Sequence, residues 1–146
     1  MNGFLAGLIA TFVMTIIQIP IKRKLGLYAV LEWHENQSIM SYLTKKNVDE
    51  VVLSGLILHF INGGLAGIVF SVLIWFLGVT YWLPGMGMIY GILLWFFTLA
   101  LIHERVTGLS LREHPLGLTP SIISLLLHLV YGFMLGIWPI ITVIVL

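Results

Sequence analysis

Two histidines, His59 and His128, are the residues most able to do chemistry in this chain of 146 residues, because both lie within long apolar stretches. Each is followed three positions later by a second polar side chain, which is Asn62 in one case and Tyr131 in the other. An imidazole in apolar surroundings needs partners for its ring nitrogens. His59, Asn62, His128 and Tyr131 therefore make up the candidate cofactor-binding site.

Three interpretations of this histidine pair follow from the residues. In the first, each imidazole is neutral and hydrogen-bonds a neighbouring helix, which is a structural role. In the second, His59 and His128 are the axial ligands of a haem b, and nearby glycines make room for the porphyrin. In the third, they hydrogen-bond a quinone, a lipid or another small molecule, with Tyr131 as a further partner. No HxxxH or HExxH motif occurs, so we expect no metal site and no catalytic residues.

The composition excludes several classes of protein. Hydrophobic residues make up 60% of the chain, charged residues only 9%, and the mean hydropathy is +1.08. Soluble domains carry about 25% charged residues, so a water-soluble globule is excluded. A formal net charge of +1 argues against nucleic acid as a partner. The absence of cysteine excludes disulfide exchange and thiolate metal sites.

The positions of the charges predict the fold. All charged residues lie in two windows, 22–50 and 104–113, and the rest of the chain is free of them. A helix needs about 20 apolar residues to cross the hydrocarbon core of a bilayer. We therefore expect an all-α integral membrane protein that forms a single domain over residues 1–146. Its antiparallel bundle would contain four transmembrane helices, at about 3–21, 50–78, 83–102 and 120–146.

The basic residues predict the orientation of this bundle. All seven Lys and Arg residues lie in the loops 22–49 and 103–119, and the short second loop has none. The positive-inside rule then places both basic loops in the cytoplasm and both termini outside, in a multi-pass protein of the cell (inner) membrane. His59 and His128 each lie about eight residues from the cytoplasmic start of their helix. This spacing puts both imidazoles at roughly the same depth, about 12 Å at 1.5 Å per residue.

Polar side chains gather in the cytoplasmic half of the predicted spans, yet none of them is Asp, Glu, Lys or Arg. Proton-coupled and cation-coupled transporters usually carry an ionisable group in the bilayer, so we do not expect one here. The pattern indicates a closed polar interior or an inward-facing crevice, and not a through-channel. Besides the histidines, this set contains Thr11, Thr15, Gln18, Thr98, Ser121 and Ser124.

The cytoplasmic rim of the predicted bundle carries three His–acid neighbours: His34-Glu35, His103-Glu104 and Glu113-His114. Adjacent residues on a helix point about 100° apart, so these are not ligand pairs of the i, i+3 or i, i+4 kind. We expect them to belong to a solvated interface.

Each predicted span carries a pair of glycines four residues apart, which lets helix backbones approach closely in lipid. These faces either hold the bundle together or dock a partner protein. The pairs are Gly3/Gly7, Gly63/Gly67, Gly87/Gly91 and Gly132/Gly136.

Two stretches carry a resemblance to a known family. They are Gly3-xx-Ala6-Gly7-xx-Ala10-Thr11-xx-Met14-Thr15, which ends in Pro20, and His128-xx-Tyr131-Gly132. They resemble the YagU-type family of small prokaryotic inner-membrane proteins of unknown function, and the resemblance extends over about a third of the chain. The resemblance implies an integral helical bundle and no particular chemistry.

The sequence leads to two hypotheses about function. The first is a non-catalytic accessory or scaffolding subunit that packs against a larger membrane complex, such as a respiratory one. Its partners would be the lipid bilayer and other integral membrane subunits, or further copies of itself. The alternative is a membrane protein that uses His59 and His128 to bind haem b, a quinone or a small molecule. A haem protein would be coloured after purification, whereas a scaffold would copurify with larger chains.

Overall fold

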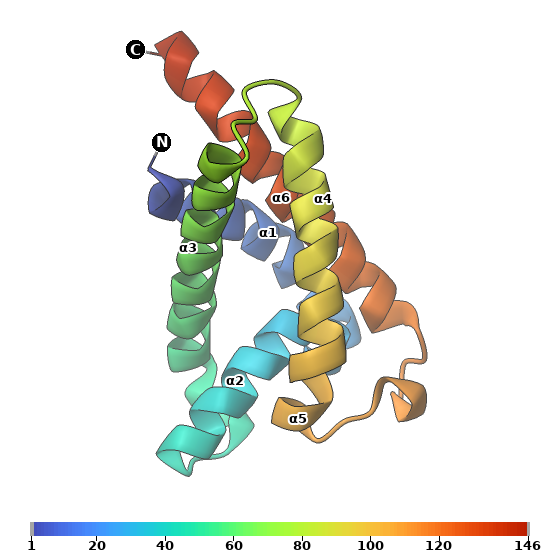
Figure 1. The fold of residues 1–146 in the computed structure, drawn as a ribbon. Coiled ribbons are helices and arrows are strands. Elements are labelled where there is room, and N and C mark those ends of the chain that lie inside the picture. Colours follow the sequence, from blue (N-terminus) through green and yellow to red (C-terminus); the bar gives the residue numbers. More distant parts are fainter. Residues whose placement is uncertain (1, 146) are drawn as a thin grey trace.

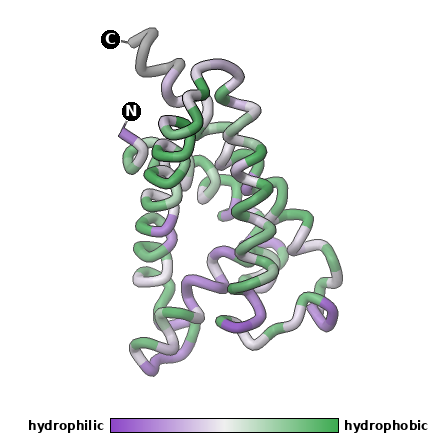
Figure 2. Tube along the Cα trace, in the orientation of Figure 1, coloured by the Kyte–Doolittle hydropathy of each residue, from purple (hydrophilic) through white to green (hydrophobic). Residues whose placement is uncertain are grey.

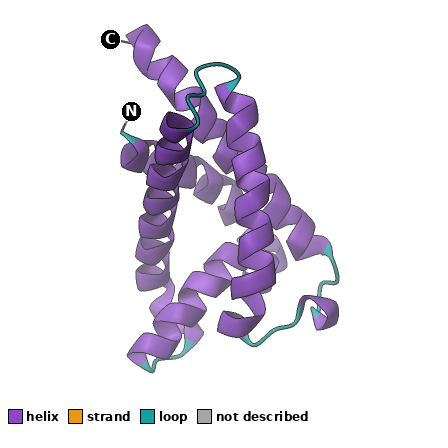
Figure 3. Ribbon diagram, in the orientation of Figure 1, coloured by secondary structure: helices purple, strands orange, loops and turns teal. Residues whose placement is uncertain are grey.

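A computed structural model describes residues 2–145, with side chains for residues 2–139. These residues are helical with short connections, and no strand occurs among them (Figure 3). The helices are α1 (Gly3–Leu25), α2 (Leu31–Thr44), α3 (Val52–Phe76), α4 (Leu83–Phe97), α5 (Glu104–Thr107) and α6 (Thr119–Val145). A π-helical segment, η3 (Thr98–His103), joins α4 to α5, and the 3-10 turns are η1 (Leu27–Ala29), η2 (Val48–Val51) and η4 (Leu111–Glu113).

Four helical segments are long and apolar enough to cross a membrane: Gly3–Leu25, Val48–Phe76, Leu83–Thr107 and Thr119–Pro139. The predicted all-α fold with four transmembrane helices is therefore confirmed, and the bounds differ by a few residues. The third span extends beyond the predicted residue 102, because η3 and α5 continue the helix of α4.

Glycine pairs bring the long helices together in two close-packed pairs, α1 with α3 and α4 with α6. A Cβ atom on Gly67 of α3 would overlap the backbone of Gly3 and Gly7 of α1. In the second pair, a Cβ atom on Gly132 of α6 would overlap the carbonyl of Gly87 of α4. The predicted small-residue faces thus pack against one another inside this chain.

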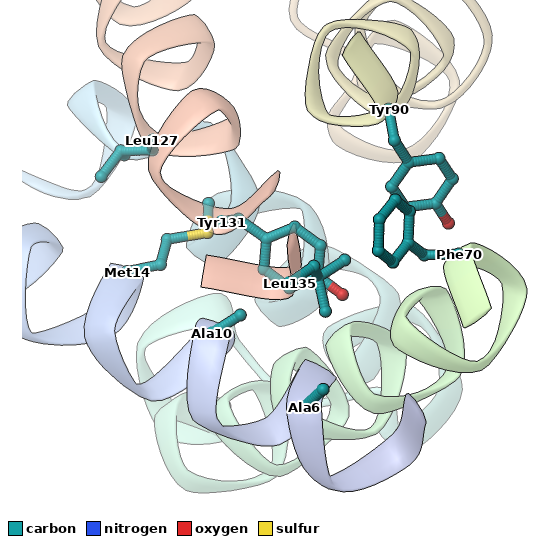
Figure 4. Packing of buried hydrophobic residues seen from close by; sticks show 8 residues of the cluster. All are labelled: Ala6, Ala10, Met14, Phe70, Tyr90, Leu127, Tyr131 and Leu135. Atoms are coloured by element: carbon teal, nitrogen blue, oxygen red, sulfur yellow. The ribbon is translucent and has the colours of Figure 1, made fainter. Parts of the chain in front are cut away.

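The apolar core lies between α1, α6 and the upper parts of α3 and α4 (Figure 4). Phe70 of α3 and Tyr90 of α4 meet there with their ring centroids 5.3 Å apart. The hydroxyl of Tyr90 donates to the carbonyl of Ala66 at 2.8 Å. The complete cluster is Ala6, Ala10, Met14, Phe70, Tyr90, Leu127, Tyr131 and Leu135.

Helix α2 is the main departure from the predicted organisation. The glycine at position 26 adopts a positive φ of 86° at the end of α1, and the chain turns back there towards the bundle. Figure 1 shows α2 lying across one end of the long helices, and Figure 2 shows that hydrophilic residues concentrate there. Residues 31–38 are buried, apart from the half-buried Trp33. The bundle therefore encloses the carboxyl groups of Glu32 and Glu35, although neither residue belongs to a span.

The predicted solvated interface is accordingly wrong for several of the His–acid neighbours. His34, Glu35, His103 and His114 are all buried, because α2 and the segment after α5 fold onto the charged end of the bundle. Their sequence neighbours Glu104 and Glu113 are exposed, as expected.

Candidate ligand-binding site

A cavity of about 310 Å³ lies inside the bundle, between α2 and the core. Ligand pockets in proteins span about 300–1,000 Å³, so this volume suits a small molecule or one ring of a larger one. The wall is made of polar and apolar side chains from α1, α2, α3, α4, η3 and α6. They are Thr11, Met14, Glu32, Glu35, Asn36, Ile39, His59, Asn62, Gly63, Ala66, Leu94, Thr98, Ile102, His128 and Tyr131.

The structure brings all four predicted site residues to the wall of this cavity. His59 and Asn62 come from α3, and His128 and Tyr131 come from α6. The amide of Asn62 donates to Asn36 Oδ1 at 2.8 Å, which ties α3 to α2. The Tyr131 hydroxyl donates to the carbonyl of Gly63 at 2.6 Å, which ties α6 to α3.

Two neighbouring groups contact the Nδ1 atom of His128 and fix the orientation of its ring. This atom lies 2.9 Å from the carbonyl oxygen of Ser124, one turn earlier in α6. It also lies 3.3 Å from Glu32 Oε1. Because a carbonyl oxygen only accepts, Nδ1 is the protonated nitrogen of this ring.

The carboxylate of Glu32 is the centre of a buried polar network. The hydroxyl of Ser124 donates to Oε1, and Gln18 Nε2 donates to Oε2 at 3.0 Å. Trp33 Nε1 in turn donates to Gln18 Oε1 at 2.7 Å. Burial raises the pKa of Glu32, but hydrogen bonds from His128 and Ser124 outweigh it and lower the pKa to about 2. Glu32 is therefore an ionised group with saturated hydrogen bonding.

Glu35 lies one helical turn further along α2 and has the opposite character. Its carboxylate lines the cavity, and its Oε1 atom is 3.0 Å from His103 Nδ1. Burial raises the pKa of Glu35, and the negative charge of Glu32 raises it further, while His103 opposes both effects. The pKa values of these two carboxyl groups, which lie on one face of α2, are thus shifted in opposite directions. Such a pair separates a group that can exchange a proton from a group that stays charged.

His59 lines the cavity, and one of its ring nitrogens has no hydrogen-bonding partner in the described part of the chain. The side chain is buried, and its Nε2 atom has no hydrogen-bonding partner among the side chains and backbone of residues 2–139. Buried polar atoms in folded proteins are nearly always paired with protein or with water. Because this nitrogen is also closed to water, a partner in the cavity would reach it only after a small movement of the side chains around it.

Three further imidazoles, His34, His103 and His114, surround the outer side of Glu35. The rings of His34 and His103 have centroids 6.2 Å apart, and the ring of Tyr28 meets His34 edge-on at 4.9 Å. Burial and then the nearby His103 and His114 lower the pKa of His34 to about 4. Each of the three imidazoles has one buried nitrogen without a partner in the described part of the chain.

Sequence reasoning missed α2 and this histidine cluster, although one signal was present. Between residues 25 and 44 the only charges are Glu32 and Glu35, spaced i, i+3, and they directly follow the apolar run Ala29–Leu31. Two carboxylates on one face of a helix, without basic residues beside them, suit a buried helix with acceptor groups pointing inwards.

The cavity opens sideways between α3 and α4. These two helices make few direct contacts, and they meet chiefly through Tyr90 at the level of Ala66 and Phe70. Lining residues on this side are exposed, namely Asn62 of α3 and Ile102 of η3. Lining residues from α1, α2 and α6 are mostly buried. Figure 1 shows the separation of α3 and α4, with α1 and α6 crossing behind them.

The site does not suit a haem b. The space next to the Cα atoms of the nearby glycines is already occupied: Thr11 of α1 lies against Gly63, and Gly87 of α4 lies against Gly132. These glycines therefore leave no room for a flat macrocycle. The cavity volume is also at the lower end of the range for small ligands. Among the residues with described side chains, no three His, Asp or Glu groups are placed to hold a metal ion.

The chain matches the model of a protein family over residues 1–140. The description of that family is "Family of unknown function (DUF6789)", and because the match covers nearly the whole chain, the protein belongs to it. No curated protein and no solved structure matches the chain. The resemblance to the YagU-type family stays a prediction.

Proposed function

We propose that this member of the DUF6789 family binds a lipophilic molecule with a hydrogen-bonding head group, of the quinone class, inside the membrane. The observation that carries the proposal is the cavity that opens between α3 and α4 and has buried polar groups on its inner wall. A ligand that travels in the bilayer would enter from the side, with its head towards α2 and its tail between the two helices.

The chemistry of the wall fits a ring that bears carbonyl or hydroxyl groups. His59 lines the cavity, and a ring N–H of its imidazole would donate to a carbonyl oxygen. Glu35 can accept a hydrogen bond from a hydroxyl group while it is ionised, and donate one to a carbonyl while it is protonated. Apolar side chains such as Met14 and Leu94 would contact the faces of the ring. The combination of an apolar pocket with a few convergent polar groups is typical of small-molecule sites.

The experiment is a titration of the purified protein in mild detergent with a decyl-substituted benzoquinone, followed by thermal unfolding. Specific binding stabilises the folded state by about 2.7 kcal/mol at a ligand concentration of 100 times Kd. We expect a saturable rise in Tm and a weaker affinity for the His59→Leu variant. Ile61→Ala is the matched control, because Ile61 lies two residues away on α3 and faces outwards. Equal affinity in all three proteins, or no saturable rise, would contradict the proposal.

The accessory or scaffolding role remains the second hypothesis. Its supposed docking faces, the glycine pairs, are occupied within this chain, so they lend it no support. Purification of the native protein from its membrane tests this role directly. Stoichiometric recovery of the same larger subunits would favour it.

We also infer the location of the protein from its charges. The basic residues all lie at the end of the bundle that carries α2 and α5, and the connection between α3 and α4 has none. The positive-inside rule then places that charged end in the cytoplasm of a prokaryotic cell, with both termini outside the inner membrane.

A further inference from the structure

Glu35 stands between the cavity and a group of imidazoles that leads to the surface. On one side its carboxylate lines the cavity. On the other side Glu35 Oε1 is 3.0 Å from His103 Nδ1, and His103 is itself fully buried. Beyond His103 lie His34 and, at the rim, the ring of Tyr28, which is 51% exposed. A continuous series of polar side chains thus connects the cavity with the charged end of the bundle.

Each imidazole along this series has a buried ring nitrogen without a hydrogen-bonding partner in the described part of the chain. His103 uses Nδ1 for Glu35, while its Nε2 atom is buried without a partner in the described chain. The same is true of His34 Nδ1 and His114 Nε2. The three atoms are closed to water in this conformation, so a water that bridges two of the rings would enter with a small movement of their side chains.

From this arrangement we propose that His103, His34 and His114 form a proton path to Glu35, and that filling of the cavity is coupled to uptake of one proton by Glu35. The inference rests on the proposed function, since it concerns the same cavity and its ligand. The groups that face Glu35 are Glu32 on α2, His128 on α6 and His103 at the end of η3. Glu32 is occupied by Ser124, Gln18 and His128, so Glu35 is the carboxyl group that can change its charge.

The transfer balances without any oxidant or reductant. A proton from solution first forms an N–H bond at His103 Nε2, passed on by a water in contact with His34 or His114. The N–H bond at Nδ1 of the resulting imidazolium then breaks, its proton forms an O–H bond on Glu35, and His103 is left neutral with its proton on Nε2. The net change is one proton from solution bound on Glu35.

Ligand binding would drive this uptake by removing water. A ring that fills the cavity displaces the water that hydrates the Glu35 carboxylate, and an ionised group without hydration is costly in an apolar interior. Protonation removes that cost and turns Glu35 into a hydrogen-bond donor for a carbonyl oxygen of the ligand. Binding of a neutral ligand and binding of a proton therefore favour each other.

The experiment uses the full-length protein in weakly buffered detergent solution with a pH-indicator dye. The oxidised decyl benzoquinone is added without any reductant, so no redox protons arise. We expect uptake of one proton per bound ligand, and a Kd that rises tenfold per unit of pH above the pKa of Glu35. Glu35→Gln should bind the ligand with a Kd that is independent of pH and without proton uptake. Glu104→Gln is the matched control, because this carboxyl group is next to His103 in sequence but exposed.

A stopped-flow measurement tests the path separately from Glu35. His103→Gln removes the relay but keeps a side chain that hydrogen-bonds Glu35, so we expect slower uptake, by tenfold or more, with unchanged stoichiometry. Equally fast uptake would show that protons reach Glu35 by another route. A pH-independent Kd for the unsubstituted protein would overturn the coupling while leaving the proposed function intact. Absence of ligand binding would overturn both.

Discussion

His103 and Glu35 form a buried contact of 3.0 Å between the end of the third span and a helix that lies outside all four spans. The two residues are 68 positions apart in the chain. The contact fixes the inner end of α2 against the bundle and leaves one carboxylate oxygen of Glu35 available to the cavity. The stability of this region should therefore depend on pH through Glu35 and Glu32 in opposite directions.

Glu35→Gln should stabilise the protein at high pH. The pKa of Glu35 is raised in the folded state, so the native protein is favoured while Glu35 is protonated and loses that advantage as pH rises through the folded pKa. Gln cannot ionise, so the variant should have a higher Tm than the unsubstituted protein at about pH 8 and an equal Tm at about pH 4. A lower Tm at both pH values would show that the ionised form of Glu35 is the stabilising one.

Glu32→Gln should have the opposite effect. Its pKa is lowered from 4.5 to about 2 in the folded state, so the stability that it provides is present above the unfolded pKa and disappears as pH falls through this window. At neutral pH the amide cannot accept from all of Ser124, Gln18 and His128, and an unsatisfied buried partner costs about 1–3 kcal/mol. Unfolding in detergent at several pH values measures the difference, which should shrink in acid.

His59 and His128 should be energetically coupled when the cavity is filled. Both residues line the same cavity, so we expect a benzoquinone bound there to contact both. In a double-mutant cycle with leucine at each position, we expect the loss of binding free energy in the double variant to be less than the sum of the single losses. The coupling should exceed about 0.6 kcal/mol, the average for hydrogen bonds between membrane helices. Additive losses would mean that the two residues share no ligand.

Gly67→Ala should destabilise the bundle, whereas Gly64→Ala should not. A Cβ atom on Gly67 would overlap the backbone of Gly3 and Gly7, which cannot move without separating α1 from α3. Overpacking of this kind costs about 1–3 kcal/mol. On Gly64 the same atom meets only the ring of Phe4, which is partly exposed and can rotate away. Unfolding of both variants in parallel measures the contrast, and equal losses would show that α1 and α3 do not depend on this close approach.

Single cysteines at Lys45 and Thr80 should react with a membrane-impermeant reagent from opposite sides of the membrane. Lys45 lies at the C-terminal end of α2, and Thr80 lies in the connection between α3 and α4. The chain has no other cysteine, so each label reports one position. We expect Thr80 to react in intact cells and Lys45 only after the membrane is opened. The reverse pattern would invert the inferred orientation.

The number and positions of the spans could be predicted because they depend on local properties of the chain. In lipid every backbone polar group must be satisfied within the segment, so a charge-free apolar stretch of sufficient length forms a helix wherever it is placed. For the same reason His59 and His128 could be identified from the sequence, since an imidazole in such a stretch is conspicuous. The glycine pairs were also visible, although which helices they join was not.

Only the tertiary structure decided which residues of the charged segments are buried. Glu32, Glu35 and His103 look like loop residues in the sequence, since charges between spans usually face water. They are enclosed because α2 turns back at Gly26 and finds partners far along the chain, such as Ser124, which is 92 positions from Glu32. The desolvation of a carboxylate is offset only when these distant donors come together, and no local pattern of residues reports that meeting. The lipid surroundings determine which stretches form spans, so the spans could be predicted from the sequence. The chemistry of the cavity depends on how α2 packs, which only the tertiary structure shows.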